Sequence, residues 1–143
     1  MASWADFERS SPELAAFGKV RLEGMVAYLA TVDAHGAPRV HPVSPWFAVG
    51  GLFIRMYPSS PKVRDLERDP RYALHSLVDD DDGTAGEFAI RGHAALVADS
   101  QRLGAANEEK ATPERYVVLE FDIEDVLATT YDDEETSRRR WRA

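Results

Sequence analysis

The sequence contains no cysteine. Disulfide bonds, a thiolate nucleophile and a thiolate metal site are therefore excluded, and the composition fits a reducing, intracellular compartment. No stretch approaches the roughly 18 consecutive apolar residues that a membrane-spanning helix requires. The N-terminus also lacks the basic region followed by an apolar run that is typical of a secretion signal. We therefore predict a cytoplasmic protein without membrane contacts.

Basic residues are also few. Lysine and arginine number 17 against 25 aspartates and glutamates, a net charge of -8, whereas nucleic-acid-binding proteins are generally basic. The remaining composition, with 44% hydrophobic and 29% charged residues, is ordinary for a soluble globular protein. At 143 residues we expect one domain, residues 1–143, with a single core and no nucleic-acid partner.

Two common functional motifs are missing. There is no G-x-S-x-G sequence, so a serine nucleophile on a strand-to-helix turn is not indicated. No G-x-G-x-x-G leads from a strand into a helix, and Gly50-Gly51 is interpreted as a hairpin turn rather than a nucleotide-binding loop. Neither acyl transfer nor dinucleotide binding on a Rossmann fold is therefore supported.

The hydrophobic pattern that is present favours strands. β-Branched and aromatic residues predict three strands within residues 25–57, separated by turns at 33–36 and at Gly50-Gly51. The same signals predict strands at 71–78, 87–97 and 114–131, and helices at 12–24, at 59–70 and within 99–109. This order predicts a mainly β protein in which six antiparallel strands form a small closed barrel with helices packed at its ends.

Proline marks the second of these strands. Pro38, Pro42 and Pro45 fall within it, and proline cannot donate a hydrogen bond to a strand ladder. We expect this strand to lie at a sheet edge or to bulge, which would free its backbone and side chains to line a cleft or to meet a partner subunit.

Three stretches, in their order along the chain, resemble a known family. "AYLATVDAHGAPRVHPVSPWF", "GGLFIRMYPSSPKVRDLERDPRYALHS" and "EFAIRGHAALV" are similar to the pyridoxamine 5'-phosphate oxidase-like flavin-binding split β-barrel superfamily. The resemblance covers about residues 26–98. It implies a six-stranded antiparallel split β-barrel, a homodimer with two flavin sites at its interface, and flavin-dependent redox chemistry.

The stretch "YPSSPKVRDLERDP" places Ser59, Ser60 and Lys62 at the start of a predicted helix. A helix N-terminus offers unpaired amides and a partial positive charge, the serines add hydroxyl donors and the lysine adds a full charge, so a phosphate could bind here. The family has an S-x-K sequence at this place that holds the flavin phosphate, which implies this role for Ser60 and Lys62. It also implies a phosphate contact from Arg39. The residues alone allow Ser60 to be a simple helix cap and Lys62 to be solvated.

The sequence departs from the namesake oxidase at two places. The family's arginine-led sequence ends five residues later in a lysine, and Ser44 stands there instead. The C-terminal segment that closes over the pyridoxal ring has no counterpart beyond "RRRWRA". We therefore do not expect oxidation of vitamin B6. The chain is more similar to shorter members, whose cofactor is flavin mononucleotide (FMN) or the deazaflavin coenzyme of the factor-420 type.

Three histidines, His41, His75 and His93, fall in predicted strands. Each lacks a second metal ligand close in sequence, so we interpret them as core or cleft-lining residues and predict no metal site. His41 alternates with Arg39 and Val43 on one strand face. Of the three histidines, His41 is the one expected to face the cofactor.

Two further predictions concern the partner subunit. Residues 131–143 show no periodicity and are expected to form a flexible or partner-contacting tail; in the second case Trp141 would stack at the partner's cofactor cleft. Trp46, Phe47 and Phe53 exceed what one small core needs, and a two-fold homodimer would bury them.

Taken with the resemblance, the residues lead to an oxidoreductase hypothesis. An FMN-dependent enzyme would transfer hydride between the flavin and a small organic substrate. The alternatives are a deazaflavin-dependent reductase and a non-catalytic flavin-binding carrier or sensor. Because the cofactor carries the redox chemistry, the protein needs no conspicuous acid–base pair, and no catalytic residue is assigned from the sequence.

Overall fold

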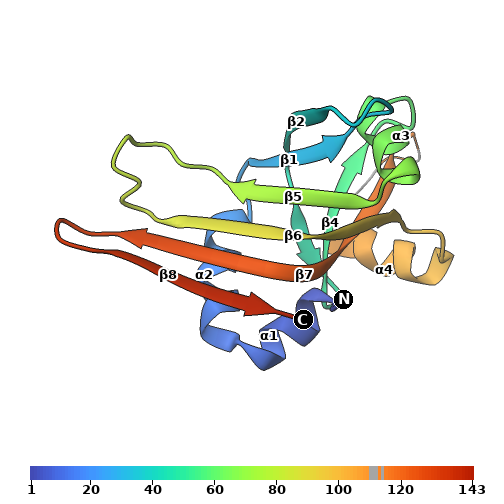
Figure 1. Cartoon of the computed structure of the whole chain (residues 1–143). Coiled ribbons are helices and arrows are strands. Elements are labelled where there is room, and N and C mark those ends of the chain that lie inside the picture. The colour runs from blue at the N-terminus through green and yellow to red at the C-terminus, as the bar shows by residue number, and fades with distance from the viewer. Residues whose placement is uncertain (110–112, 114) are drawn as a thin grey trace.

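A curled antiparallel sheet dominates the computed structural model, which describes residues 1–109, 113 and 115–143 (Figure 1). Neighbouring strands follow the order β2-β1-β5-β6-β7-β4-β3, and β8 pairs with β7. The strands are β1 (Ala27–Val32), β2 (Pro38–Val43), β3 (Trp46–Ala48), β4 (Gly51–Met56), β5 (Arg71–Ser76), β6 (Glu87–Leu96), β7 (Val117–Tyr131) and β8 (Thr136–Arg142).

Four helices lie against this sheet within the described residues. They are α1 (Trp4–Ser10), α2 (Pro12–Leu22), α3 (Pro61–Arg68) and α4 (Ser100–Glu109). Figure 1 shows α3 and α4 at the end of the sheet that lies away from the β5–β6 and β7–β8 loops. Within the described part of the chain, no helix is long and apolar enough to cross a membrane.

The predicted mainly β fold with helices at its ends is confirmed, but the predicted number of strands is wrong. The described residues form eight strands rather than six. One addition arises because the second predicted strand is divided at Ser44 and Pro45, where β2 ends and the short β3 turns to pair with β4. Pro45 cannot donate a hydrogen bond to a strand ladder, so the strand is interrupted at this proline.

The other added strand corrects the prediction for residues 131–143. This segment is not a flexible tail, because β8 pairs with β7 from Thr136 to Arg142. On the inner side of β8, Trp141 packs against Phe7 with ring centroids 4.9 Å apart, and its Nε1 donates to Ser10 Oγ at 2.7 Å. Trp141 is therefore packed within its own chain while staying partly exposed, and its stacking at the partner's cofactor cleft stays a prediction. The outward residues of β8 are charged, which hides the strand from a hydrophobic pattern.

α1 has no counterpart in the sequence prediction, although a capping box begins it. The Ser3 hydroxyl accepts from the Asp6 amide at 3.1 Å, and the Asp6 carboxylate accepts from the Ser3 amide at 3.1 Å. Trp4 and Phe7 then point inward and pack near Phe88 of β6. α1 therefore seals one side of the core.

β2 lies at the sheet edge, as its prolines predict. Its inner face carries Arg39, His41 and Val43, with Val43 buried. Val40 on its outer face is 65% exposed. Because no described strand continues the sheet beyond this edge, the side chains of β2 are free to border a cleft.

Of the three aromatic residues expected at a dimer surface, two are buried inside the protomer and the third is partly buried. Trp46 and Phe53 are buried with ring centroids 5.7 Å apart, and Trp46 Nε1 donates to the Ala106 carbonyl of α4 at 3.1 Å. Phe47 packs against Trp4 at 4.6 Å. For Trp46 and Phe53 the predicted place at a dimer surface is wrong, because the protomer already buries them; for the partly buried Phe47 it stays a prediction.

Candidate functional site

The start of α3 lies directly after β4, where a tight turn places Lys62. The Ser60 amide donates to the Tyr57 carbonyl at 2.9 Å, and Pro61 takes the first helical position, for which its fixed φ is suited. Lys62 is thus the second helical residue. The Ser60 side chain makes no capping hydrogen bond, so its role is not that of a simple helix cap. Ser59 is exposed in the turn.

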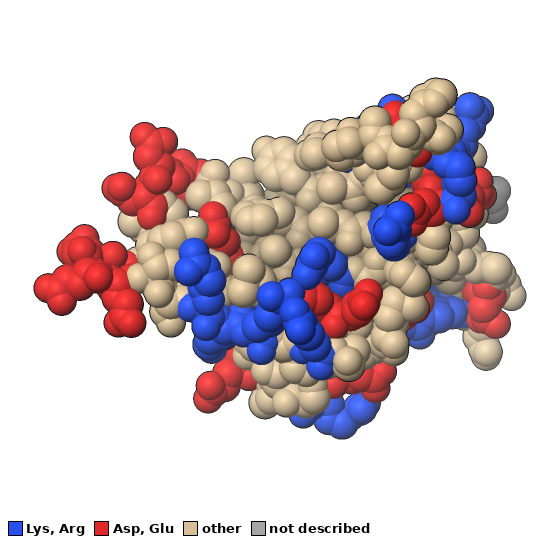
Figure 2. All heavy atoms as spheres, in the orientation of Figure 1, with Lys and Arg blue, Asp and Glu red and all other residues tan. Residues whose placement is uncertain are grey.

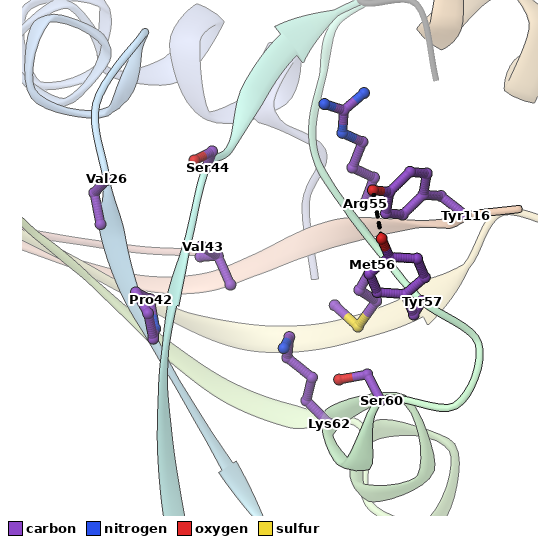
Figure 3. A pocket seen from close by; sticks show the side chains of 10 residues that line it. All are labelled: Val26, Pro42, Val43, Ser44, Arg55, Met56, Tyr57, Ser60, Lys62 and Tyr116. Carbon is purple, nitrogen blue, oxygen red and sulfur yellow. Dashed lines mark hydrogen bonds between the residues drawn. The ribbon is translucent and has the colours of Figure 1, made fainter. Parts of the chain in front are cut away.

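A cleft opens above this helix start, with a volume of about 380 Å³ (Figure 3). Lys62 and Ser60 form its base, and the Lys62 amine points into the space between two walls. The lining residues come from the β1 approach, β2, β4, α3 and the start of β7; they are Val26, Pro42, Val43, Ser44, Arg55, Met56, Tyr57, Ser60, Lys62 and Tyr116.

The two walls differ in chemistry. One wall is mainly apolar and comes from Val26, Pro42 and Val43. In the other wall Tyr57 and Tyr116 lie with ring centroids 4.6 Å apart, and their hydroxyls share a hydrogen bond of 3.1 Å. The cleft therefore offers an apolar surface and an aromatic surface above a cationic base, which suits a flat ring that carries an anionic group.

Positive charge is concentrated on the aromatic side as well as at the base. The Arg55 guanidinium lies 5.3 Å from the centroid of the Tyr116 ring. Hydrogen bonding with Tyr57 and with Arg115 lowers the pKa of the Tyr116 hydroxyl. An anion that enters the cleft meets cationic groups on two of its sides.

Lys62 carries a charge that the fold does not neutralise. Burial lowers the pKa of its amine. Among the described residues, no carboxylate lies within ion-pair distance of it. A partly desolvated cation without a counter-ion is costly for a protein to retain, so the arrangement favours a bound anion.

Arg39 is in the opposite situation. Its Nε donates to the buried carboxylate of Asp65 on α3 at 2.8 Å, and Arg68 donates to the same carboxylate at 3.2 Å. Burial raises the pKa of Asp65, but the hydrogen bonds from Arg39, Thr31 and Arg68 outweigh it and lower that pKa overall. Much of the charge of Arg39 is therefore offset by Asp65.

His41 lies between Arg39 and Val43 on the inner face of β2. Burial lowers its pKa, and the nearby charges of Lys62 and Arg39 lower it further, while Asp65 raises it. The imidazole is therefore neutral at neutral pH. It borders the cationic base of the cleft without lining the cleft itself.

The structure brings together part of the predicted site. Lys62, Ser60 and Val43 line the cleft. Arg39 and His41 lie beside α3, on the same strand face as Val43, but they do not line the cleft. The helix start could be identified from its serines, proline and lysine. The strand pattern indicated only that Arg39 and His41 share a face with Val43, and not whether that face reaches the cleft.

Sequence reasoning missed the aromatic wall. Arg55 stands inside the otherwise apolar β4, and Tyr57 follows directly after β4; both were visible as signals. Tyr116 had none, because it lies about 60 residues further along the chain and joins Tyr57 only through the pairing of β4 with β7. Such a contact is set by topology.

The remaining histidines show no ligand-binding arrangement. His75 Nδ1 lies 2.7 Å from the Ser76 carbonyl, and His93 pairs across the sheet with Arg71. Within the residues that the structure describes, no group of three or more histidine, aspartate or glutamate side chains is arranged to hold a metal ion.

Comparison with known proteins identifies the family. The family model described as pyridoxamine 5'-phosphate oxidase matches residues 13–130. The chain belongs to the pyridoxamine 5'-phosphate oxidase-like superfamily. A comparison with curated protein sequences finds no match.

Solved structures with the same fold are distant in sequence. An FMN-binding, pyridoxamine 5'-phosphate oxidase-related protein from Nostoc punctiforme PCC 73102 is 14% identical with a TM-score of 0.63, and the match covers 100% of this chain and 99% of that one. An F420 reductase is 18% identical with a TM-score of 0.58, covering 76% and 94%. A heme binding protein from Mycobacterium smegmatis is 16% identical with a TM-score of 0.65, covering 87% of this chain and 57% of that one. The chain thus spans little more than half of the heme binding protein. At these identities the likeness establishes the split-barrel fold.

Proposed function

We propose that this superfamily member is an FMN-dependent oxidoreductase that holds the flavin phosphate with Lys62 and Ser60. The observation that carries the proposal is the partly buried Lys62 amine at the base of the cleft, which has no carboxylate partner among the described residues. A phosphate would supply the missing negative charge. The FMN-binding relative of the same fold supports FMN as the occupant.

The residues around the base fit a phosphate. The Lys62 ammonium supplies a point charge, and the Ser60 hydroxyl, free of any capping bond, supplies a donor. The helix dipole of α3 adds partial positive charge at the same end. Ser59 precedes Ser60 in the turn and would add a hydroxyl donor, and Arg39, which like Lys62 lies near His41, would add weaker electrostatic attraction.

The walls of the cleft fit a flat ring system. Tyr57 and Tyr116 offer an aromatic surface, and Val26 and Val43 offer an apolar one on the facing side. Such walls orient a ring and exclude water from its faces. The flavin itself supplies hydride transfer when it is bound.

We propose that the active assembly is a homodimer with its cofactor sites at the interface. The outer face of β1, β2 and β5 is mainly apolar, and Figure 2 shows a tan area beside a row of basic side chains. With residues of β6, β7 and β8 this face lines a hollow of about 400 Å³. Its apolar lining includes Tyr28, Ala30, Val40, Ala73, Ala89 and Leu127, and its charged lining residues are Arg91, Asp125 and Arg140. Pro42, which lines the cleft, stands opposite Tyr28 of this face. A second copy seated here would therefore border the cleft.

The proposal is tested by comparing ligands that differ only in the phosphate. Because Lys62 is proposed to hold that group, FMN should bind at least about tenfold more tightly than riboflavin, as measured by flavin fluorescence. Equal affinities would overturn the phosphate assignment. A deazaflavin of the factor-420 type, titrated in parallel, decides between the two cofactors. Turnover with a reductant and an electron acceptor separates an enzyme from a carrier.

A further inference from the structure

Asp65 is a buried carboxylate that organises three elements around the start of α3. Its Oδ2 accepts from Thr31 Oγ1 of β1 and from Arg39 Nε of β2, both at 2.8 Å. Its Oδ1 accepts from Arg68 at 3.2 Å. Only 2% of Asp65 is exposed, and its hydrogen bonds lower its pKa despite that burial. The carboxylate is therefore an ionised acceptor whose bonds fix the groups that donate to it.

The bond between Thr31 and Asp65 determines the state of His41. A threonine hydroxyl has one proton, and Thr31 donates it to Asp65. Only lone pairs of Thr31 Oγ1 are then left for His41 Nε2, which lies 3.4 Å away. A neutral imidazole meets a lone pair favourably only if the facing nitrogen carries the proton. The neutral ring is thus protonated on Nε2, and Nδ1 is left without a proton.

We propose that Thr31 and Asp65 are positioning residues that fix neutral His41 with its proton on Nε2, so that Nδ1 takes up a proton when a phosphate binds beside Lys62. The proposal rests on the phosphate assignment made above and assigns the regulation of that same subsite. His41 then acts as a proton-linked part of the anion site.

The charges that face His41 set the direction of this linkage. Lys62 and Asp65 face it from α3 and Arg39 from β2, while the facing group from β1 is the uncharged Thr31. In the empty site, burial and the two cations lower the pKa of His41. A dianion beside Lys62 offsets those cations and raises that pKa. At a pH between the His41 pKa of the empty site and that of the occupied site, His41 takes up one proton when the anion binds. The affinity for the anion therefore rises as pH falls, by at most tenfold per pH unit. Above the bound-state value, affinity does not change with pH.

The test follows the side-chain nitrogens of His41 by ¹⁵N NMR. In the wild-type protein without ligand at pH 8, we expect a neutral ring with its proton on Nε2. Thr31→Val, which keeps the shape of the side chain but removes the acceptor, should give a mixture of tautomers, and Thr31→Ser should restore the wild-type state. His75→Gln serves as the control and should leave the His41 signals unchanged. A wild-type ring protonated on Nδ1 would overturn the proposal, and this readout does not depend on the folding of any variant.

Proton uptake is tested with sulfate, which keeps two negative charges throughout the titration. Saturating sulfate should raise the midpoint of the His41 titration in the wild-type protein, and Lys62→Ala should abolish that shift. An unmoved midpoint in the wild-type protein would overturn the proposal. The flavin assignment fails separately: if FMN binds no better than riboflavin while sulfate moves His41, the cofactor is wrong and the linkage stands. If FMN binding depends on its phosphate while His41 is unmoved, the linkage is wrong and the cofactor stands.

Discussion

Arg39 donates from Nε to the buried carboxylate of Asp65 at 2.8 Å. This ion pair joins the edge strand β2 to α3 and so holds the helix start that carries Lys62. Arg39 and Lys62, the two cations of the predicted phosphate site, therefore have different roles. Arg39 stabilises the fold, whereas Lys62 has no carboxylate partner among the described residues.

Arg39→Ala should consequently affect stability more than binding. Asp65 would lose one of its charged donors while remaining buried, and we expect the free energy of unfolding to fall by about 1–2 kcal/mol. FMN affinity should fall by less than tenfold. Urea unfolding and fluorescence titration measure the two effects. The control Arg9→Ala breaks an exposed pair with Asp6 and should change stability by less than about 0.5 kcal/mol. A stable Arg39→Ala protein with strongly weakened FMN binding would contradict this division.

The apolar outer face predicts how dimerisation can be broken. Val40→Glu places a charge at the centre of the proposed interface, on a side chain that is 65% exposed in the protomer. The variant should fold and sediment as a monomer, whereas the wild-type protein should sediment as a dimer at micromolar concentration. The matched control is Val20→Glu on α2, where the side chain is 75% exposed and lies away from that face. It should stay dimeric. A monomeric wild-type protein would remove the dimer and the shared sites together.

Asp125 predicts a dependence of stability on acid. Hydrogen bonds from Arg140 and then from Arg91 and Arg142 outweigh burial and hold the pKa of its carboxyl far below the usual range. The folded pKa is depressed, so the contribution is full above the unfolded value of about 4 and is lost as pH falls below it. Asp125→Asn should lower the free energy of unfolding by about 2–3 kcal/mol at pH 7. The difference from wild type should shrink by pH 3.

Urea titrations of both proteins at the two pH values check this expectation. Asp133→Asn, at an exposed loop position, is the control and should be neutral. An Asp125→Asn penalty that is as large at pH 3 as at pH 7 would show that the carboxylate charge is not its cause.

A paired glycine substitution tests the register of the sheet. Gly92 follows the irregularity between Arg91 and Gly92 where β6 pairs with β7, and a Cβ there would lie 2.0 Å from the Asp122 carbonyl oxygen. Gly92→Ala should cost at least about 2 kcal/mol, because a backbone atom must move. Gly104→Ala in α4 meets nothing within 4 Å and should stabilise by about 0.5–1 kcal/mol. Thermal unfolding of the two variants measures both; equal effects would contradict this register.

Much of the fold could be predicted from local sequence signals. The edge position of β2 and the start of α3 both depend on proline, whose backbone limits act locally. The turn predicted at Gly50-Gly51 lies one residue earlier, at Val49-Gly50, because Gly51 already pairs with Ala48. β8 escaped notice because its outward side chains are arginines. The role of Arg140 and Arg142 became visible only beside Asp125, on a different strand.

In the candidate site, too, local features could be predicted from the sequence and contacts between separate elements could not. Ser60 and Lys62 were identifiable because a helix N-terminus is a local feature with a known electrostatic consequence. The Tyr57–Tyr116 wall and the Arg39–Asp65 pair were not, because each joins residues from separate elements. The burial of Trp46 and Phe53 was misjudged because the count of aromatic residues does not reveal that α4 covers them.

The affinity of Lys62→Ala for FMN tests the central claim most directly. Removing one charge-assisted contact should weaken binding by about 1.5–3 kcal/mol, or about tenfold to a hundredfold, while the unfolding free energy without cofactor changes by less than about 0.5 kcal/mol. Lys19→Ala, on α2, removes a lysine whose amine lies over the Phe47 ring and should leave the affinity unchanged. A dissociation constant for Lys62→Ala that equals the wild-type value, with both FMN and the deazaflavin, would contradict the phosphate site and the flavin function built on it.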